Sequence, residues 1–224
     1  MVSPFPAGSG AAAPTPPGVR IDRVVTHGTF SLDGGTWEVD NNVWVVGDDT
    51  ECVVIDAAHD GRAIVQAVRG RRVVALLLTH AHDDHIDAAA QVSDATRAPT
   101  YLHPGDHELW ERVYPVTPDR DLADGDVVAV AGTRLHVLHT PGHSPGSCCF
   151  NVPDLGVVFT GDTLFEGGPG ATGRSFSDFR VIVDSIRGRL LSLPPQTRVL
   201  TGHGADTTVG AEAPHLQEWI ERGH

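Results

Sequence analysis

Short apolar runs separated by polar segments recur along most of this chain, and their lengths predict a mixture of strands and helices. Runs rich in valine and leucine occupy residues 41–48, 51–56 and 71–80, and each has the length of one strand. Between the last two, the segment Asp60–Gly70 has its apolar residues at helical spacing. An aspartate before such a segment and a glycine after it are typical of a capped helix.

The remaining runs extend this pattern along the chain. Strands are expected at 99–103, 126–132, 133–140, 146–152, 155–161 and 197–202. Helices are expected at 83–97, 176–191 and 211–220, with a loop or short helix at 106–112. Strands interleaved with helices, without a fixed repeat or an internal linker, indicate a layered α/β domain over residues 19–224, in which helices cover sheets.

The composition narrows the setting in which this domain works. The first 18 residues are rich in Pro, Ala and Gly and contain no basic residue, which predicts a disordered tail rather than a signal peptide. No apolar run approaches the roughly 20 residues of a membrane helix. The three cysteines, Cys52, Cys148 and Cys149, lie in apolar runs, and an odd number is not typical of a disulfide framework. We therefore expect a cytoplasmic protein with buried free thiols and no membrane contact.

The charge limits the kinds of partner. The formal net charge is −13, and all 16 basic residues are arginine. An acidic surface repels the phosphate backbone of a nucleic acid. The densest basic cluster, Arg69, Arg71 and Arg72, is interpreted as the solvated end of a helix. We expect a small-molecule substrate and no nucleic-acid partner.

Four of the predicted strands end in a threonine that is followed closely by a histidine or an aspartate. These residues are His80, His143, Asp162 and His203. Active sites of open α/β sheets lie at strand ends, where loops converge over a rigid floor. The sequence therefore predicts that the four side chains meet at one site, where the residues directly after His80 join them.

This set of side chains is typical of a metal centre. A tetrahedral ion takes about four ligands at roughly 2.0–2.2 Å, so seven donors favour two ions. The assignment gives His80, His82 and His143 to a first ion, Asp84, His85 and His203 to a second ion, and leaves Asp162 as a bridge. Two ions about 3.5–4 Å apart lower the pKa of a water between them and polarise a carbonyl.

The ordered motifs resemble those of the metallo-β-lactamase superfamily. The matching residues are the run His80-Ala81-His82-Asp83-Asp84-His85, then Pro141-Gly142-His143, Gly161-Asp162 and Gly202-His203, preceded by Asp56 at a strand end. The resemblance covers essentially everything after the tail and implies an αββα four-layer sandwich. It implies two divalent metal ions at one edge, with zinc as the first expectation and iron or manganese as alternatives. It also implies that Asp56 braces the metal loop and that Asp84 orients the nucleophile.

Within this superfamily the chain is most similar to small glyoxalase II-type (hydroxyacylglutathione hydrolase-like) enzymes, which cleave thioesters of low-molecular-weight thiols. Asn41-Asn42 before a strand and an intact Asp84 fit that group. Glyoxalase II has a C-terminal domain that supplies basic contacts to glutathione. Few residues follow His203, so we do not expect that domain here, and the chain has no lysine to make such contacts. The arginine-only composition, rich in Ala, Gly and Val, favours a high-GC bacterium and mycothiol as the thiol.

Other functions are weighed against this one. A persulfide dioxygenase-like oxidoreductase would hold one iron on the His82 side of the motif, with His143 and Asp162. A β-lactamase is disfavoured because members of that group with two zinc ions commonly have cysteine at the position of Asp162. A nuclease is disfavoured by the net charge of −13.

Residues outside the ligand set also have predicted roles. His59, at the end of the strand that carries Asp56, is expected to reach the substrate. Asp83, at the variable position of the motif, is expected to face solvent or to cap a helix.

The segment Gly167–Ser175 is interpreted as a flap beside the metals. Its Arg174 replaces the lysine that a phosphate loop requires, so a nucleotide loop is disfavoured. Arg174 is expected to contact an anionic group of the substrate, with an ion pair to Asp178 as the alternative. Ser175 or Ser177 is expected to begin the following helix.

Overall fold

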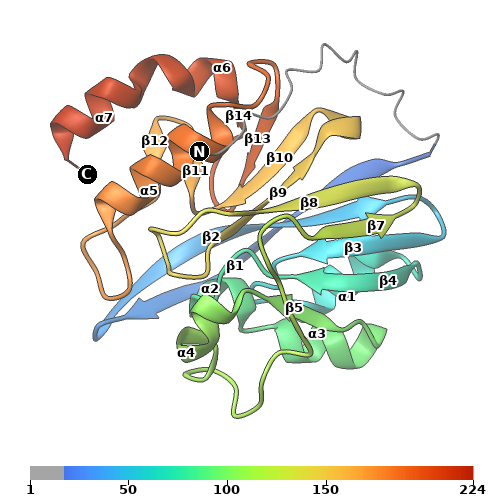
Figure 1. Ribbon diagram of the computed structural model, residues 1–224. Coiled ribbons are helices and arrows are strands. Elements are labelled where there is room, and N and C mark those ends of the chain that lie inside the picture. Colours follow the sequence, from blue (N-terminus) through green and yellow to red (C-terminus); the bar gives the residue numbers. More distant parts are fainter. Residues whose placement is uncertain (1–17, 224) are drawn as a thin grey trace.

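Two six-stranded sheets pack face to face in the computed structural model, and helices cover the outer face of each sheet (Figure 1). The layers follow the order α, β, β, α, which confirms the predicted sandwich. The structure describes residues 18–223, so nearly all of the expected tail at 1–18 lies outside the described residues. No helix within 18–223 is both long and apolar enough to cross a membrane.

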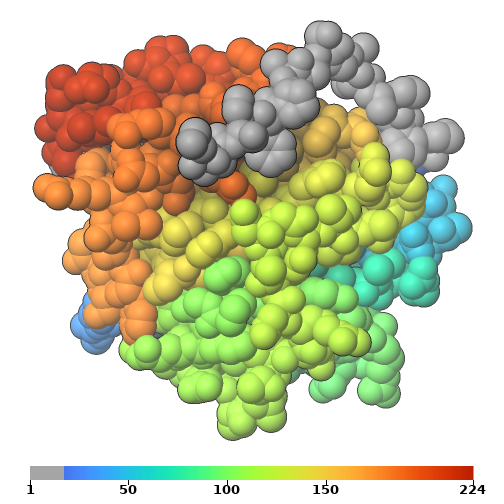
Figure 2. Space-filling model, in the orientation of Figure 1, coloured from blue at the N-terminus to red at the C-terminus, as the bar shows by residue number. Residues whose placement is uncertain are grey.

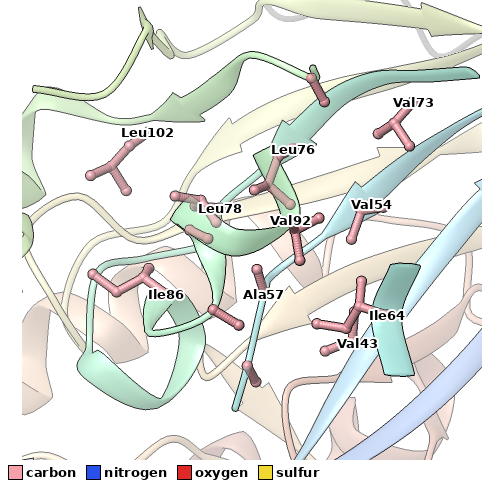
Figure 3. Packing of buried hydrophobic residues seen from close by; sticks show 14 of the residues in the cluster. Val43, Val54, Ala57, Ile64, Val73, Leu76, Leu78, Ile86, Val92 and Leu102 are labelled. Carbon is pink, nitrogen blue, oxygen red and sulfur yellow. The ribbon is translucent and has the colours of Figure 1, made fainter. Parts of the chain in front are cut away.

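The first sheet is built from the N-terminal half of the chain. Its strands, in spatial order, are β1 (Arg20–Leu32), β2 (Gly35–Gly47), β3 (Glu51–Ile55), β4 (Arg72–Leu77), β5 (Thr100–Leu102) and β6 (Arg120–Asp121). The helices of this half are α1 (Gly61–Val68), α2 (Asp83–Ile86), α3 (Ala89–Thr96) and α4 (His107–Trp110), with a 3₁₀ turn at Pro104–Asp106. Figure 3 shows the apolar side chains between this sheet and its helices.

The second sheet follows in the C-terminal half, with the spatial order β14-β13-β10-β9-β8-β7. Its strands are β7 (Val127–Val130), β8 (Thr133–His139), β9 (Cys148–Val152), β10 (Val157–Gly161), β13 (Arg198–Thr201) and β14 (Thr207–Thr208), and a separate short hairpin joins β11 (Leu164–Phe165) to β12 (Gly168–Pro169). The helices are α5 (Phe179–Ser185), continued by a π-helical turn at Ile186–Leu190, α6 (Val209–Glu212) and α7 (Leu216–Arg222), with 3₁₀ turns at Pro153–Leu155 and Ala213–His215. In the space-filling view α6 and α7 (red) lie on the opposite side of the molecule from α3 and α4 (green) (Figure 2).

The long apolar runs in the sequence arise because the central strands are buried on both faces. In β2, Trp44 and Val46 belong to the core between the sheets, whereas Val43 and Val45 pack under the helices. A strand in the middle layer of a sandwich covered by helices therefore has no solvent-facing side and no polar alternation.

Strand β1 and its hairpin with β2 were missed by the sequence analysis, which expected the first strand at 41–48. Asp33 and Gly34 form its two-residue turn with φ values of 53° and 78°, the left-handed conformations that a tight hairpin turn needs. Strand β2 begins at Gly35, well before the expected start at Asn41. The register places Phe30 opposite Trp37 near the turn.

The predicted helix at 83–97 is interrupted between α2 and α3. Ala57, in the loop after β3, donates its N–H to His85 O at 2.8 Å and accepts from Ala88 N at 3.0 Å. These bonds use backbone groups that a continuous helix would pair internally, so the helix divides here.

Two predictions about helix ends are wrong. The helix expected from 176 begins at Phe179, and Asp178, rather than Ser175 or Ser177, caps it by accepting from Arg180 N and Val181 N. Arg71 is not solvated, because its buried guanidinium donates to Asp22 and to the carbonyls of Val68 and Ala67.

The three cysteines are free and buried. Burial raises the pKa of Cys149 to about 11 and also raises the pKa values of Cys52 and Cys148. All three thiols therefore stay protonated at neutral pH.

Candidate metal centre

Seven histidine and aspartate side chains from both sheets meet at one edge of the sandwich. The segment after β4 and helix α2 supply His80, His82, Asp84 and His85, and the segments after β8, β10 and β13 supply His143, Asp162 and His203. The structure thus brings together all of the ligands that the sequence predicts. Their role as ligands stays a prediction.

Three imidazoles form the first subsite. His82 Nδ1 lies 3.0 Å from His80 Nε2 and 3.0 Å from His143 Nε2. All three residues are buried. Nitrogens that bind one tetrahedral ion at about 2.0–2.1 Å lie roughly 3.3 Å apart, so these three atoms are close to the spacing that one ion requires.

The second subsite combines two imidazoles with a carboxylate. His85 Nε2 and His203 Nε2 are 3.2 Å apart. Asp84 Oδ2 lies 3.5 Å from the first of these nitrogens and 3.4 Å from the second. The three atoms again converge closely enough to hold one ion.

Asp162 lies between the two subsites. Its Oδ2 is 3.6 Å from His143 Nε2 and 3.3 Å from His203 Nε2. Its Oδ1 is buried without a hydrogen-bond partner and faces His85 Nε2 at 3.3 Å. A carboxylate in this position can bind ions in both subsites.

Hydrogen bonds direct the metal-facing nitrogens of these imidazoles. Three of the rings donate Nδ1–H to an oxygen: His85 to Asp56 Oδ2 at 2.9 Å, His143 to Ala171 O at 2.9 Å and His203 to Asp40 O at 2.7 Å. In a neutral ring this leaves a lone pair on Nε2, the atom that points into the site.

His80 is directed in the same way. Thr79 Oγ1 gives its proton to Asp56 Oδ2 at 2.9 Å, so it accepts from His80 Nδ1 at 3.0 Å. The site therefore gathers several lone pairs and two carboxylates within contact distance of one another. Such groups repel unless cations or protons lie between them, and this donor set fits divalent metal ions.

The two subsites differ in their affinity for protons. Burial, together with neighbouring histidines, lowers the pKa of His82 to about 3 and that of His80 well below its usual value. Burial would also lower the pKa of His203, but the carboxylates of Asp162 and Asp84 outweigh it and raise this pKa to about 10. The same carboxylates raise the pKa of His85.

The carboxylates respond in the opposite direction. Burial would raise the pKa of Asp84, but His85 and His203 lower it to about 2. His203 and His85 likewise hold the pKa of Asp162 well below its usual range. Both carboxylates are therefore ionised at neutral pH.

Two buried carboxylates brace the loops that carry the ligands. Asp56 accepts from Thr79 N at 2.8 Å as well as from Thr79 Oγ1 and His85 Nδ1, as the bracing role requires. Asp106 accepts from Ala81 N at 2.9 Å and from Ser144 Oγ at 2.7 Å, which joins the loop of His80 and His82 to the loop of His143. Asp106 was missed by the sequence analysis, because its partners are distant in the chain and the residues around it form no metal motif.

Asp83 does not cap α2. It is half-buried and accepts from Ser31 N at the end of β1. His59 does not line the pocket over the metal site. Its ring is buried behind Asn41, which separates it from Asp84.

A pocket of about 560 Å³ opens over the two subsites. Its apolar walls are formed by Phe30, Val39, Phe165, Ala171 and Ala205. Arg174 is the arginine among the residues that line it.

Aromatic side chains hold the guanidinium of Arg174. Its Cζ lies 3.9 Å from the ring centroid of Trp37 and 5.4 Å from that of Phe30, both on the β1–β2 hairpin. The alternative pairing with Asp178 is not found, since Asp178 caps α5 instead. The next residue, Ser175, donates its N–H to Asp33 Oδ2 at 2.9 Å, so the flap is attached to the turn of the hairpin.

Comparisons with known proteins agree with this geometry. A family model described as the metallo-beta-lactamase superfamily matches residues 36–203. Hydroxyacylglutathione hydrolase GloC of Haemophilus influenzae is 31% identical in an alignment of 181 residues that covers 74% of this chain and 85% of GloC.

Two solved structures are similar in both fold and sequence. TTHA1623 in a di-iron-bound form shares 38% identity with a TM-score of 0.69, over 78% of this chain and 93% of that one. The BLEG-1 B3 metallo-beta-lactamase shares 31% identity with a TM-score of 0.72, over 85% of this chain and 97% of that one.

Proposed function

This chain belongs to the metallo-beta-lactamase superfamily, and from that premise we propose that it is a hydrolase with two divalent metal ions that cleaves thioesters of a low-molecular-weight thiol. The observation that carries the proposal is the convergence of seven ligand side chains in two adjacent subsites, with Asp162 between them. Zinc is the first expectation, and iron is the alternative that the di-iron form of TTHA1623 makes plausible. The similarity to GloC supports a thioester as the substrate class.

When bound, the ions would supply Lewis acidity, which lowers the pKa of a water and polarises the acyl carbonyl. The protein orients the reactants around them. Asp84 Oδ2 faces the centre as an ionised carboxylate, with a pKa of about 2, so it can accept a hydrogen bond from the attacking water. A leaving thiol has a pKa near 8.5 and departs as a thiolate, so no general acid is needed.

The pocket supports a small substrate. A volume of about 560 Å³ is within the range of small-molecule sites, and its apolar walls suit the acyl chain and the methylene groups beside sulfur. Arg174, which packs against Trp37, is expected to bind an anionic group of the substrate. We propose that the thiol in this substrate is a cytoplasmic thiol other than glutathione, for example mycothiol.

The test begins with the metal content of the purified protein and continues with a panel of acyl thioesters of glutathione, coenzyme A and mycothiol. The expected result is two ions per chain and hydrolysis of at least one thioester. Failure of the metal-loaded protein to hydrolyse any of them would refute the thioester assignment. One iron per chain, together with consumption of oxygen when a persulfide is added, would favour the persulfide dioxygenase-like oxidoreductase. Hydrolysis of a β-lactam but of no thioester would favour a β-lactamase.

A further inference from the structure

A line of four hydrogen-bonded side chains leads from the surface to the second subsite. Asp87 Oδ2 lies 3.0 Å from His59 Nδ1, and His59 Nε2 lies 2.9 Å from Asn41 Oδ1. Asn41 Nδ2 then donates to Asp84 Oδ2 at 3.0 Å. The line ends on a residue assigned to the second ion, whereas none of these contacts involves the first subsite.

The chemistry of the line fixes the proton positions. The amide nitrogen of Asn41 donates to Asp84 Oδ2, so the amide oxygen of Asn41 faces His59 Nε2. That oxygen can only accept, so His59 Nε2 carries the proton of this hydrogen bond, while His59 Nδ1 lies beside the carboxylate of Asp87.

The surroundings of His59 are built to hold this ring. Its side chain is 4% exposed. Asp87 Oδ1 accepts from His59 N at 2.6 Å, so one carboxylate holds both the backbone and the ring. On strand β1, Gly28 leaves the space that the ring fills, since a Cβ at that position would lie 2.1 Å from His59 Nδ1.

The atom at the end of the line is the one that matters for an ion. Asp84 Oδ2, which accepts from Asn41, is also the oxygen that faces His85 Nε2 and His203 Nε2. We propose that His59 is a positioning residue for the second metal ion, because it orients Asn41 and thereby holds Asp84 Oδ2 toward that ion. The inference rests on the two-ion centre of the proposed function, and it gives His59 a role distinct from substrate binding.

The test compares how tightly the whole protein and its variants bind zinc. Calorimetric titration of each metal-free form with zinc measures the affinity of each ion. His59→Asn removes the ring and keeps a residue that tolerates the positive φ of 59° at this position. We expect the second ion to bind about 10- to 100-fold more weakly, the range for lost outer contacts, and the first ion to bind within about twofold of the wild type. Equal weakening of both ions, or no weakening of the second, would overturn the proposal.

Matched variants separate positioning from a general loss of structure. His107→Asn removes an imidazole that pairs with Asp121 at 3.0 Å away from the line, and should leave both ions unaffected. The methyl group of Gly28→Ala, on strand β1, crowds the ring of His59 and should likewise weaken binding of the second ion. This variant tests the proposal independently if His59→Asn folds poorly. Because His59 acts through Asn41, the double variant with Asn41→Ala should bind no more weakly than Asn41→Ala alone. Additive losses would contradict the mechanism.

A spectroscopic measurement tests the protonation without metal or substrate. The ¹⁵N shift of His59 Nε2 should be that of a protonated nitrogen that donates to Asn41 Oδ1, and an Nε2 without a proton would overturn the proposal. Thioester turnover is not a readout in these experiments. If wild-type protein binds two ions and hydrolyses no thioester, the substrate proposal fails and the role of His59 stands. If it binds fewer than two, the role of His59 fails as well.

Discussion

Gly202 lies against the carboxylate of Asp162, so closely that a Cβ atom at position 202 would be 2.3 Å from Asp162 Oδ1. The glycine before His203 is therefore required by space at the bridge between the two subsites. A side chain there must displace either Asp162 or the backbone that carries His203.

Gly202→Ala should consequently reduce metal affinity at both subsites, by about 10- to 100-fold, because Asp162 faces both of them. Calorimetric titration of the metal-free variant measures this effect. Gly188→Ala is the control, since nothing lies within 4 Å of the added atom, and its affinities should match those of the wild type. Unchanged binding in Gly202→Ala would show that Asp162 does not bridge.

Metal binding should depend on pH differently at the two subsites. In the metal-free protein the raised pKa of His203, about 10, keeps that ring protonated at neutral pH, so the second ion must displace a proton. Affinity at this subsite should rise with pH toward 10, by up to about tenfold per unit for each proton released. The lowered pKa values of His80 and His82 leave those rings neutral, so these two ligands should add no pH dependence to the binding of the first ion above pH 5.

Titrations in buffers of different ionisation enthalpy count the released protons. Proton release confined to the first binding event would contradict this assignment of charge.

Asp56→Ala should weaken both the fold and the metal site. The change leaves Thr79 N and His85 Nδ1 without their acceptor in a buried place, which costs about 1–3 kcal/mol for each group. We expect the free energy of unfolding to fall by about 2–6 kcal/mol and metal affinity to fall by about 10- to 100-fold. Denaturant titration and calorimetry measure the two effects.

The cap of helix α1 offers a control for Asp56. Asp60→Ala removes the bonds to Arg62 N and Ala63 N and should cost about 1 kcal/mol without changing metal affinity. A parallel loss of affinity in Asp60→Ala would mean that stability alone governs binding.

Arg174→Gln should act on substrate binding. Its guanidinium lies over Trp37 and lines the pocket, where it can pair with an anionic group of the substrate. We expect KM to rise about tenfold for anionic thioesters with kcat nearly unchanged, as for loss of uniform binding. A neutral thioester serves as the control and should show no change. An effect confined to kcat would indicate that Arg174 positions the flap instead.

The fold could be predicted because its main signals are local. Continuous valine and leucine runs mark strands with two buried faces, and the helix capped by Asp60 has its signal within four residues. The tight turn at Asp33-Gly34 is also a local signal for a hairpin, and recognising it would have extended β2 to Gly35.

The candidate site was predictable to the extent that its residues follow strand ends. His80, His143, Asp162 and His203 are separated in the chain, yet the structure places them together as the strand ends suggested. The placement of His59, Asp83 and Arg71 was not predictable in this way, because each depends on one partner from a distant segment. His59 lies 18 residues from Asn41, and Asp83 lies 52 residues from Ser31.

The burial of the three cysteines bears on the reaction proposed for this protein. A thioester hydrolase works beside acyl donors that can modify exposed cysteines, and the disulfide form of its product thiol can exchange with exposed cysteines. Cys52, Cys148 and Cys149 are shielded from both reactions by their burial and raised pKa values. The mass of the folded protein should stay unchanged in the presence of excess thioester or oxidised thiol, so repeated turnover would not lead to self-inactivation.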